Sequence, residues 1–355
     1  MSTTLQSKEV VYTSGIDSLK VIDSKVTLPL APTQIAIKIH YVGINPVDYK
    51  LMGFAAFKLW QSLKGVGQEI SGEIIHIGER VSKFKPGDRV CVLLSNPFQG
   101  GLKTYLVTTT ADRILKIPDE MPYDQAASFM MSFGTAFKSL SFVDWAKLKD
   151  TPSSLLILGG STNTGVFATQ LAKKYFDIKT VAATCSAKSI PRVTSFGVNY
   201  TLDYTSKTPI AEQAAELVQN ELAGVKFDMI FDCIGGTELF ASISSILKPA
   251  NTGAYYVTVV GDDPHFGLNW GVVTMISKYL FAKPLWGFNY KLYVLEGSEG
   301  FLDAAKKKIL VPGSEYKIPI DTVYPWTEYK EALSKLMTHQ AKGKIVLKVI
   351  EEEEE

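Results

Sequence analysis

The stretch Ser154-Leu155-Leu156-Ile157-Leu158-Gly159-Gly160-Ser161-Thr162-Asn163-Thr164-Gly165-Val166-Phe167-Ala168 decides the fold of this chain. An apolar run ends at a glycine pair, small polar residues follow, and a helical pattern then begins. This order is typical of a buried parallel strand turning into a helix whose first N–H groups can hold a phosphate. Gly159 and Gly165 match the first and third glycines of the dinucleotide-binding fingerprint, whereas Thr162 replaces the middle one. Taken alone, the stretch fits a nucleotide site and an ordinary strand-turn-helix equally well.

Four strand-like runs that alternate with helical segments favour the nucleotide interpretation. They are Leu155–Leu158, Thr180–Thr184, Phe227–Asp232 and Ala254–Val260. This alternation predicts a doubly wound parallel sheet, so residues 126–290 are expected to form a Rossmann dinucleotide-binding domain. Ligands of such a sheet bind at the carboxyl ends of its strands.

The two ends of the chain have a different pattern. Residues 1–125 carry short strand-like runs separated by glycine turns, which indicates a small irregular β-barrel. Asp124 is expected to cap a helix where the pattern changes, and Gly343–Val349 reads as a strong terminal strand. Residues 291–350 are too few for a separate domain, so we expect them to complete the barrel.

Composition excludes several classes of function. Lys and Arg number 37 and Asp and Glu 36, a net charge of +1, which argues against a nucleic-acid partner. The three cysteines, Cys91, Cys185 and Cys233, are far apart, which indicates a reducing, cytoplasmic environment without disulfides.

Targeting and membrane segments are not evident. The first ten residues show no apolar signal region, and no stretch reaches the roughly 18 apolar residues of a membrane span. The nearest candidate, Val272 to Phe288, is interrupted by Lys278, Lys283 and Pro284. It leaves peripheral contact with a lipid droplet or membrane surface open. The acidic tail, residues 351–355, is expected to be solvated and disordered.

Several short motifs, in order, carry a resemblance to a known family. They are Gly43-Ile44-Asn45-Pro46-Val47-Asp48, Phe84-Lys85-Pro86-Gly87-Asp88-Arg89-Val90, Ser132-Phe133-Gly134-Thr135-Ala136-Phe137, Gly159–Gly165, Phe231-Asp232-Cys233-Ile234-Gly235-Gly236 and Gly343-Lys344-Ile345-Val346. Together they resemble the zinc-independent quinone oxidoreductase (zeta-crystallin-like) branch of the medium-chain dehydrogenase/reductases, especially its fungal members. The resemblance covers residues 10–349 and implies a GroES-like catalytic barrel, a Rossmann domain and a homodimer.

Zinc ligands of the wider superfamily are missing at the positions compared. Asn45 stands in the turn where a cysteine ligand is expected, and Gln68 stands near the expected histidine. The four histidines are scattered without ligand spacing. We therefore predict no metal site.

The cofactor prediction is NADPH. An NAD site places an acid after the second strand, but Ala183-Thr184-Cys185-Ser186-Ala187-Lys188 has none. Ser186 and Lys188 can bind a 2′-phosphate, and the resemblance adds Tyr204. The remaining predicted cofactor residues are the turn Gly159, Gly160, Ser161, Thr162, Asn163, Thr164 and Gly165 and, by resemblance, Thr135, Val257, Gly261 and Lys344.

The resemblance also implies the catalytic residues. It places Asn45 in a cleft between domains, where its amide could bind a substrate oxygen or the cofactor, although a plain turn role before Pro46 is an equal alternative. Lys50 and Tyr49 are candidate proton donors, with Tyr41 and bulk water as alternatives. The predicted function is NADPH-dependent, zinc-free reduction of quinones or α,β-unsaturated carbonyl compounds.

Two other functions remain open from the sequence. A Cβ at Thr162 is expected to push the backbone away from a pyrophosphate, which favours a non-catalytic NADPH-binding, lipid-surface or partner-binding relative of the same fold. A zinc alcohol dehydrogenase is the third, weaker alternative.

Overall fold

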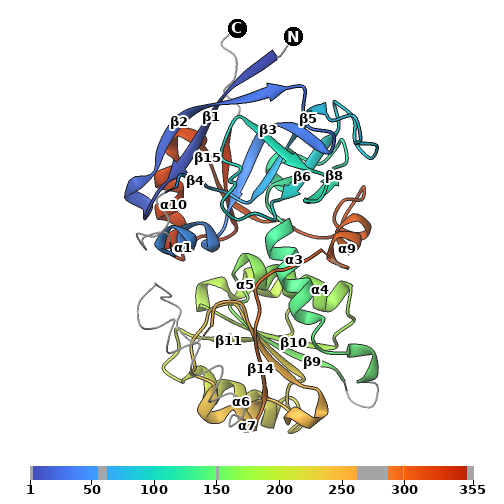
Figure 1. Ribbon diagram of the computed structural model, residues 1–355. Helices are drawn as coiled ribbons and strands as arrows, with labels where there is room; N and C mark the ends of the chain where they lie inside the picture. Colours follow the sequence, from blue (N-terminus) through green and yellow to red (C-terminus); the bar gives the residue numbers. More distant parts are fainter. Residues whose placement is uncertain (1–2, 55–61, 149–151, 262–286, 299, 350–355) are drawn as a thin grey trace. The chain divides into compact units, whose positions relative to one another are not determined.

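The computed structural model describes residues 3–54, 62–148, 152–261, 287–298 and 300–349 (Figure 1). The chain divides into two compact units. Unit 1 comprises Met1–Met131 and Ser298–Glu355, and unit 2 comprises Ser132–Gly297.

Unit 1 contains a seven-stranded sheet in the order β15-β16-β3-β5-β6-β8, with β7 paired to β3. A smaller sheet has the order β2-β1-β4. The strands are β1 (Thr3–Tyr12), β2 (Lys20–Leu28), β3 (Gln34–Ile44), β4 (Lys64–Gly65), β5 (Glu69–Ile77), β6 (Arg89–Leu93), β7 (Tyr105–Thr109), β8 (Arg113–Lys116), β15 (Ile320–Pro325) and β16 (Lys344–Lys348).

The C-terminal segment completes unit 1, as the sequence pattern predicts. β16 pairs antiparallel with β3 and parallel with β15, so it lies inside the sheet between them. Its residues Ile345 and Leu347 are buried in the same core as Ile35, Ile37 and Ile39 of β3. The helices of this unit are α1 (Pro46–Phe54), α2 (Tyr123–Ala126), α9 (Phe301–Lys308) and α10 (Tyr329–Met337), and α3 (Met130–Leu140) begins at its boundary.

Unit 2 is built on a six-stranded, fully parallel sheet in the order β11-β10-β9-β12-β13-β14. The strands are β9 (Ser154–Leu158), β10 (Thr180–Cys185), β11 (Tyr200–Asp203), β12 (Met229–Asp232), β13 (Tyr255–Thr258) and β14 (Asn289–Leu292). Every residue of β9 and β12 is buried, because helices cover both faces of such a sheet.

The helices of unit 2 are α4 (Asn163–Lys174), α5 (Ile190–Thr194), α6 (Ile210–Asn220) and α7 (Ile243–Ile246). The chain runs from β9 through β10 to β11 on one side, and then from β12 to β14 on the other. The direction therefore changes between β9 and β12. In open parallel sheets this is the point where ligands bind, at the carboxyl ends of the strands.

Some sequence expectations need correction or fall outside the described residues. Asp124 does not cap a helix: Pro122 precedes the short α2, and a new helix begins only at Met130. The unit boundaries fall at 131/132 and 297/298, where 125/126 and 290/291 were predicted. The acidic tail and the Val272–Phe288 segment, apart from its last two residues, lie outside the described residues.

Candidate functional site

Asn45 precedes helix α1, and the first turn of this helix is closed by Asp48 and not by the side chain of Asn45. Asp48 accepts a hydrogen bond from the Asn45 backbone N–H at 2.7 Å, as the third helical residue of a capping box does. The Asp48 carboxylate also accepts the N–H of Gly67, which ties α1 to the segment before β5. The Asn45 amide is consequently available for other partners.

Strand register brings Lys344 to Asn45 although 299 residues separate them in the chain. Ile345 pairs with Ile44 in the antiparallel β16–β3 pair, so Lys344 falls opposite Asn45 at the strand ends. On the other side of β3, Gly43 pairs with Glu69 of β5. A Cβ on Gly43 would meet Lys344 Cε at 2.7 Å and would collide with the Ala127 carbonyl. The absence of a side chain at Gly43 thus leaves room for the Lys344 side chain to pass over β3.

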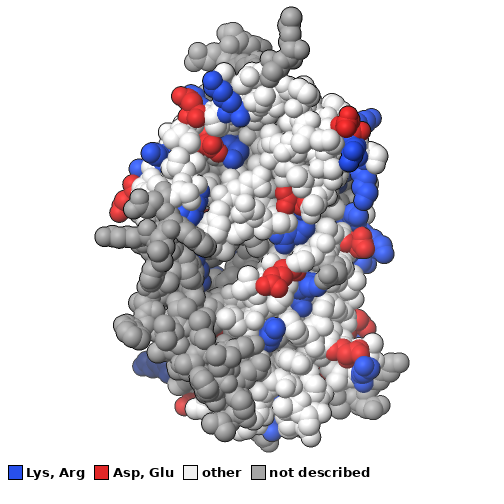
Figure 2. Space-filling view, viewed as in Figure 1, with Lys and Arg blue, Asp and Glu red and all other residues white. Residues whose placement is uncertain are grey.

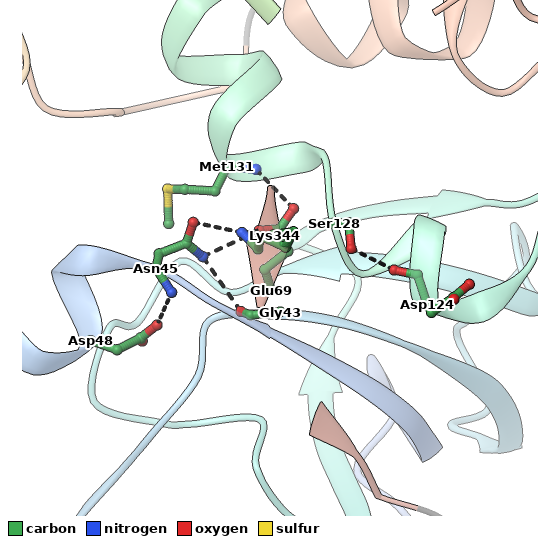
Figure 3. A network of polar contacts seen from close by, with 8 residues as sticks. All are labelled: Gly43, Asn45, Asp48, Glu69, Asp124, Ser128, Met131 and Lys344. Carbon is green, nitrogen blue, oxygen red and sulfur yellow. Dashed lines mark hydrogen bonds and ion pairs between the residues drawn. The ribbon is translucent and has the colours of Figure 1, made fainter. Parts of the chain in front are cut away.

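These residues form a closed polar network (Figure 3). Lys344 Nζ donates to Glu69 Oε2 at 2.5 Å and to Asn45 Oδ1 at 2.6 Å. Asn45 Nδ2 donates to Glu69 Oε2 at 3.2 Å and, more weakly, to the Gly43 carbonyl at 3.4 Å. The Met131 N–H donates to Glu69 Oε1 at 3.1 Å. Both N–H bonds of the Asn45 amide are therefore engaged inside the network.

The charged groups of this network are buried, so each of them has lost its hydration. Glu69 is completely buried, and Asn45, Asp48 and Lys344 are each at most 5% exposed. Burial raises the pKa of Asp48 from 3.8 to about 6, against the opposing pull of the Asn45 N–H and the Lys344 ammonium. A buried ion pair survives only when its charges are matched and hydrogen-bonded, as they are here.

The other predicted catalytic residues lie on the same elements. Tyr49 packs against the core of unit 1, and its ring meets His339 edge-on at 6.5 Å. Burial raises the pKa of Tyr49. Lys50 is half-buried on α1, and Tyr41 is half-buried on β3. Their roles as proton donors stay predictions.

In unit 2, the predicted glycine fingerprint forms a tight turn at the carboxyl end of β9. Gly159 has a φ of +89°, a conformation that glycine adopts without strain. The Gly159 N–H donates to Thr184 Oγ1 at 2.8 Å, and the Gly160 N–H donates to the Thr184 carbonyl at 2.9 Å. A Cβ on Gly165 would collide with the Gly159 carbonyl. The glycines are thus required by the approach of α4 to β9 and β10.

Thr162 has a capping role that the fingerprint comparison does not reveal. Its hydroxyl accepts the Gly165 N–H at 3.0 Å and donates to the Gly159 carbonyl at 2.8 Å. It is the N-cap of α4, a position where threonine is favoured. The side chain therefore closes the turn.

Asn163, the first residue of α4, carries the clearest sign of a missing ligand in unit 2. Both polar atoms of its amide are buried and lack a hydrogen-bond partner within the described parts of the chain. Buried polar groups are nearly always paired, so an unpaired amide at a helix N-terminus fits a bound anionic or polar group. The residues of this turn therefore fit the phosphates of a dinucleotide.

At the end of β10, Ser186 lies beside Ser189, with their hydroxyl oxygens 3.0 Å apart. Lys188 is exposed, and the Tyr204 side chain is 60% exposed. Arg192, which the sequence analysis overlooked, reaches back from α5 and donates to the Ser161 carbonyl at 3.3 Å. Ser161 lies in the glycine turn, so this contact links α5 and its cation to the predicted pyrophosphate site.

The ends of β12 and β13 are held by buried side chains. Asp232 accepts the N–H groups of Ile234 and Gly235 at 2.9 and 2.8 Å and the Tyr256 hydroxyl at 3.2 Å. Burial raises its pKa. Gly261 donates its N–H to Thr258 Oγ1 at 3.0 Å.

The other predicted cofactor residues of unit 2 lie as follows. Val257 is fully buried in β13, where it pairs with Phe231 of β12 on one side and Lys291 of β14 on the other. Thr135 is half-buried on α3.

Glu69 is the central residue that sequence analysis missed. An acid at the start of an otherwise apolar strand, Glu69-Ile70-Ser71-Gly72, was the available signal. The pairing of Glu69 with Lys344 could not be predicted from local pattern, because it depends on the register of β16. Within the described parts of the chain, no three His, Cys, Asp or Glu side chains gather as a metal site would require. The amides of Asn45 and Gln68 do not fit a catalytic zinc.

The face of the molecule shown in Figure 2 carries basic and acidic side chains interspersed, without an extended patch of one sign. None of the helices among the described residues is long and apolar enough to cross a membrane.

Comparison with known proteins places this geometry in a family. Residues 31–119 match the alcohol dehydrogenase GroES-like domain, and residues 196–347 match the zinc-binding dehydrogenase family. Protein YIM1 of Saccharomyces cerevisiae is 30% identical over 364 aligned residues, covering 97% of this chain and 98% of that protein.

Solved structures share the fold. The quinone oxidoreductase of Coxiella burnetii has a TM-score of 0.74 at 22% identity, covering 98% of this chain and 100% of the other. The CurK enoyl reductase has a TM-score of 0.73 at 21% identity, covering 96% and 99%.

The barrel, the parallel sheet and the matched domains together define an oxidoreductase of the medium-chain dehydrogenase/reductase type, a class that uses a nicotinamide cofactor. Within this superfamily the chain belongs to the family that contains the yeast protein YIM1. The predicted resemblance and fold class are thereby confirmed.

Proposed function

We propose that the chain is an NADPH-dependent, zinc-free oxidoreductase that reduces quinones or α,β-unsaturated carbonyl compounds. The observation that carries the cofactor choice is the end of β10. There, Ser186 and Lys188 follow the strand, Arg192 lies on the next helix, and Ala183–Ser189 contains no carboxylate. An acid at this place would select the ribose hydroxyl of NAD, whereas cations and hydroxyls select a 2′-phosphate.

The residues that would hold the cofactor are those of the glycine turn and its neighbours. The backbone N–H groups at the start of α4 and the Asn163 amide would receive the pyrophosphate. Ser186, Lys188 and Tyr204 would receive the 2′-phosphate. When bound, NADPH supplies a hydride to the substrate.

The remaining task of the protein is to stabilise negative charge and to deliver a proton. Hydride addition to the β-carbon of an enone leaves an enolate, and addition to a quinone leaves a hydroquinone anion. Hydrogen-bond donors must stabilise the oxygen before a proton completes the reduction. Lys50 and Tyr49 are the proposed proton donors, with Tyr41 and solvent water as alternatives. We propose that Lys344 acts by holding Asn45 and Glu69 in place, in addition to its predicted role beside the cofactor.

The proposal is tested by incubating the purified protein with NADPH and a panel of quinones and enones while following absorbance at 340 nm. We expect at least one substrate class to oxidise NADPH. Absence of turnover with every substrate, together with absence of NADPH binding, would contradict the proposal. Stoichiometric zinc in the purified protein would contradict its zinc-free part.

A non-catalytic NADPH-binding, lipid-surface or partner-binding relative remains the second candidate. The features that support it are Thr162 at the middle fingerprint position, which caps α4, and the apolar segment Val272–Phe288. NADPH binding without turnover of any substrate would favour this alternative. A homodimer and a cytoplasmic location are also proposed, from the resemblance and from cysteine usage respectively.

A further inference from the structure

Gln68 presents an unused hydrogen-bond donor beside the buried network of unit 1. Its side chain is 6% exposed, and its Nε2 group is buried without an acceptor in the described residues. The Gln68 backbone is fixed, because its carbonyl accepts the Leu94 N–H at 2.8 Å. A buried donor without a partner is rare and costly, so it calls for a specific reason.

The position of Gln68 in the chain connects this donor with the network. The preceding residue, Gly67, donates its N–H to Asp48, and the following residue, Glu69, binds Lys344 and Asn45. The backbone on both sides of Gln68 is therefore anchored by residues that belong to the network or bind to it. The polar groups of the network form hydrogen bonds with one another, and none of them accepts a hydrogen bond from Gln68 Nε2.

The Asn45 amide cannot fill the same role without breaking contacts. Its two N–H bonds already reach Glu69 and the Gly43 carbonyl, and its oxygen accepts from Lys344. Gln68 has no such commitments among the described residues. Of the two amides that stand where zinc ligands were expected, only Gln68 has a donor to give.

We propose that Gln68 Nε2 donates a hydrogen bond to the carbonyl oxygen of the substrate. This inference rests on the proposed function, because it assigns the group that stabilises the oxygen on which negative charge develops. A positioned donor of this kind acts in a site from which water is excluded. The ligand class is a neutral carbonyl compound whose oxygen accepts but does not donate.

The test uses binding rather than turnover, so it is separable from a failure of the proposed function. Acetophenone and α-methylstyrene differ by one atom pair, C=O against C=CH₂, and only the ketone can accept a hydrogen bond. Dissociation constants for both are measured by calorimetry with the wild-type protein and with Gln68→Met, an apolar substitution of similar length. Gln68→Leu is the second variant, should Gln68→Met fold poorly.

We expect the wild-type protein to bind the ketone about fivefold to tenfold more tightly than the hydrocarbon, the usual effect of one hydrogen bond. Both Gln68 variants should lose this preference while the affinity for α-methylstyrene is retained. Their urea midpoints should be unchanged or higher, because an unpaired donor has been removed. In turnover, kcat should fall for reducible enones.

Gln99→Met is the matched control, because Gln99 is a half-buried glutamine whose Nε2 donates to the Val107 carbonyl at 2.8 Å. This variant should lower the urea midpoint and leave the ketone preference intact. A ketone preference that persists in the Gln68 variants would overturn the proposal. So would a wild-type protein that does not distinguish the two ligands, since Gln68 would then satisfy itself with water.

Discussion

Thr162 replaces the middle glycine of the fingerprint, yet its hydroxyl is bonded to both ends of the turn. The free energy that it contributes is that of an N-cap. Thr162→Val should therefore lower the free energy of unfolding by about 1–2 kcal/mol and weaken NADPH binding.

Thr162→Gly should cost only a few tenths of a kcal/mol, because glycine is tolerated at an N-cap, and it should not tighten NADPH binding. Urea unfolding and NADPH titration of both variants provide the measurements, with Thr162→Ser as the control that keeps the hydroxyl. A large gain in NADPH affinity in Thr162→Gly would contradict this, because it would show that the threonine impairs cofactor binding at the turn.

Asp48 and His40 give opposite contributions to the pH dependence of stability. The pKa of Asp48 rises to about 6 on folding, so the folded state holds the extra proton between about pH 4 and 6. Its contribution is full below pH 4 and is lost as the pH rises through 6. His40 behaves in the reverse way: burial, aided by Lys38 and Arg89, lowers its pKa from 6.5 to about 4. Its contribution is full above pH 6.5 and is lost as the pH falls through 4.

Asp48→Asn should remove the first of these effects. Between pH 4 and pH 7 the wild-type protein loses the contribution of Asp48 and the variant does not. The free energy of unfolding of the variant, relative to the wild-type protein, should therefore rise by up to about 3 kcal/mol over this range. For His40→Gln, the free energy of unfolding relative to the wild-type protein should fall over the same pH range. Urea unfolding at four pH values measures both, and variant curves parallel to the wild-type curve would refute the assignment.

At the scale of elements, three segments distant in sequence meet in the Lys344–Glu69–Asn45 network. Lys344→Met leaves the Glu69 carboxylate buried without its cation, which should lower the free energy of unfolding by about 3–5 kcal/mol. The double variant with Glu69→Gln should be more stable than Lys344→Met alone, because no unpaired charge remains.

A double-mutant cycle by urea unfolding measures this interaction. Lys147→Met is the control, because the Lys147–Asp144 pair is 83% and 53% exposed and should contribute little to the free energy of unfolding. Additive effects of the Lys344 and Glu69 substitutions would contradict the ion pair.

The elements themselves were largely predictable. Apolar runs and glycine turns located β9, β10, β12 and β13, since fully buried parallel strands read as uninterrupted apolar segments. Helix starts were less predictable: Asp124 has the chemistry of a cap, but the chain turns again at Ala127 before α3.

The candidate site was only partly predictable for a physical reason. Asn45 and Lys344 were identified from motifs, but their contact depends on the register of β16 against β3, which local pattern does not specify. Glu69 was missed because its charge is explained only by a partner 275 residues away. Arg192 was missed because its contact with Ser161 depends on how α5 packs.

At the scale of the whole molecule, each unit has its own core and its own polar centre. Unit 1 contains the buried network and Gln68, and unit 2 contains the glycine turn and the end of β10, where residues 183–189 include no acid. A near-zero net charge gives no general attraction for anions. The selectivity for NADPH that we propose would therefore have to come from local groups such as Ser186, Lys188 and Arg192.

The most direct test of the central claim compares the dissociation constants of NADPH and NADH by fluorescence titration of the purified protein. The account predicts that NADPH binds at least roughly tenfold more tightly, the value of one charge-assisted contact to the 2′-phosphate, and that Lys188→Ala narrows the gap. Equal affinities, tighter binding of NADH, or no binding of either would contradict it.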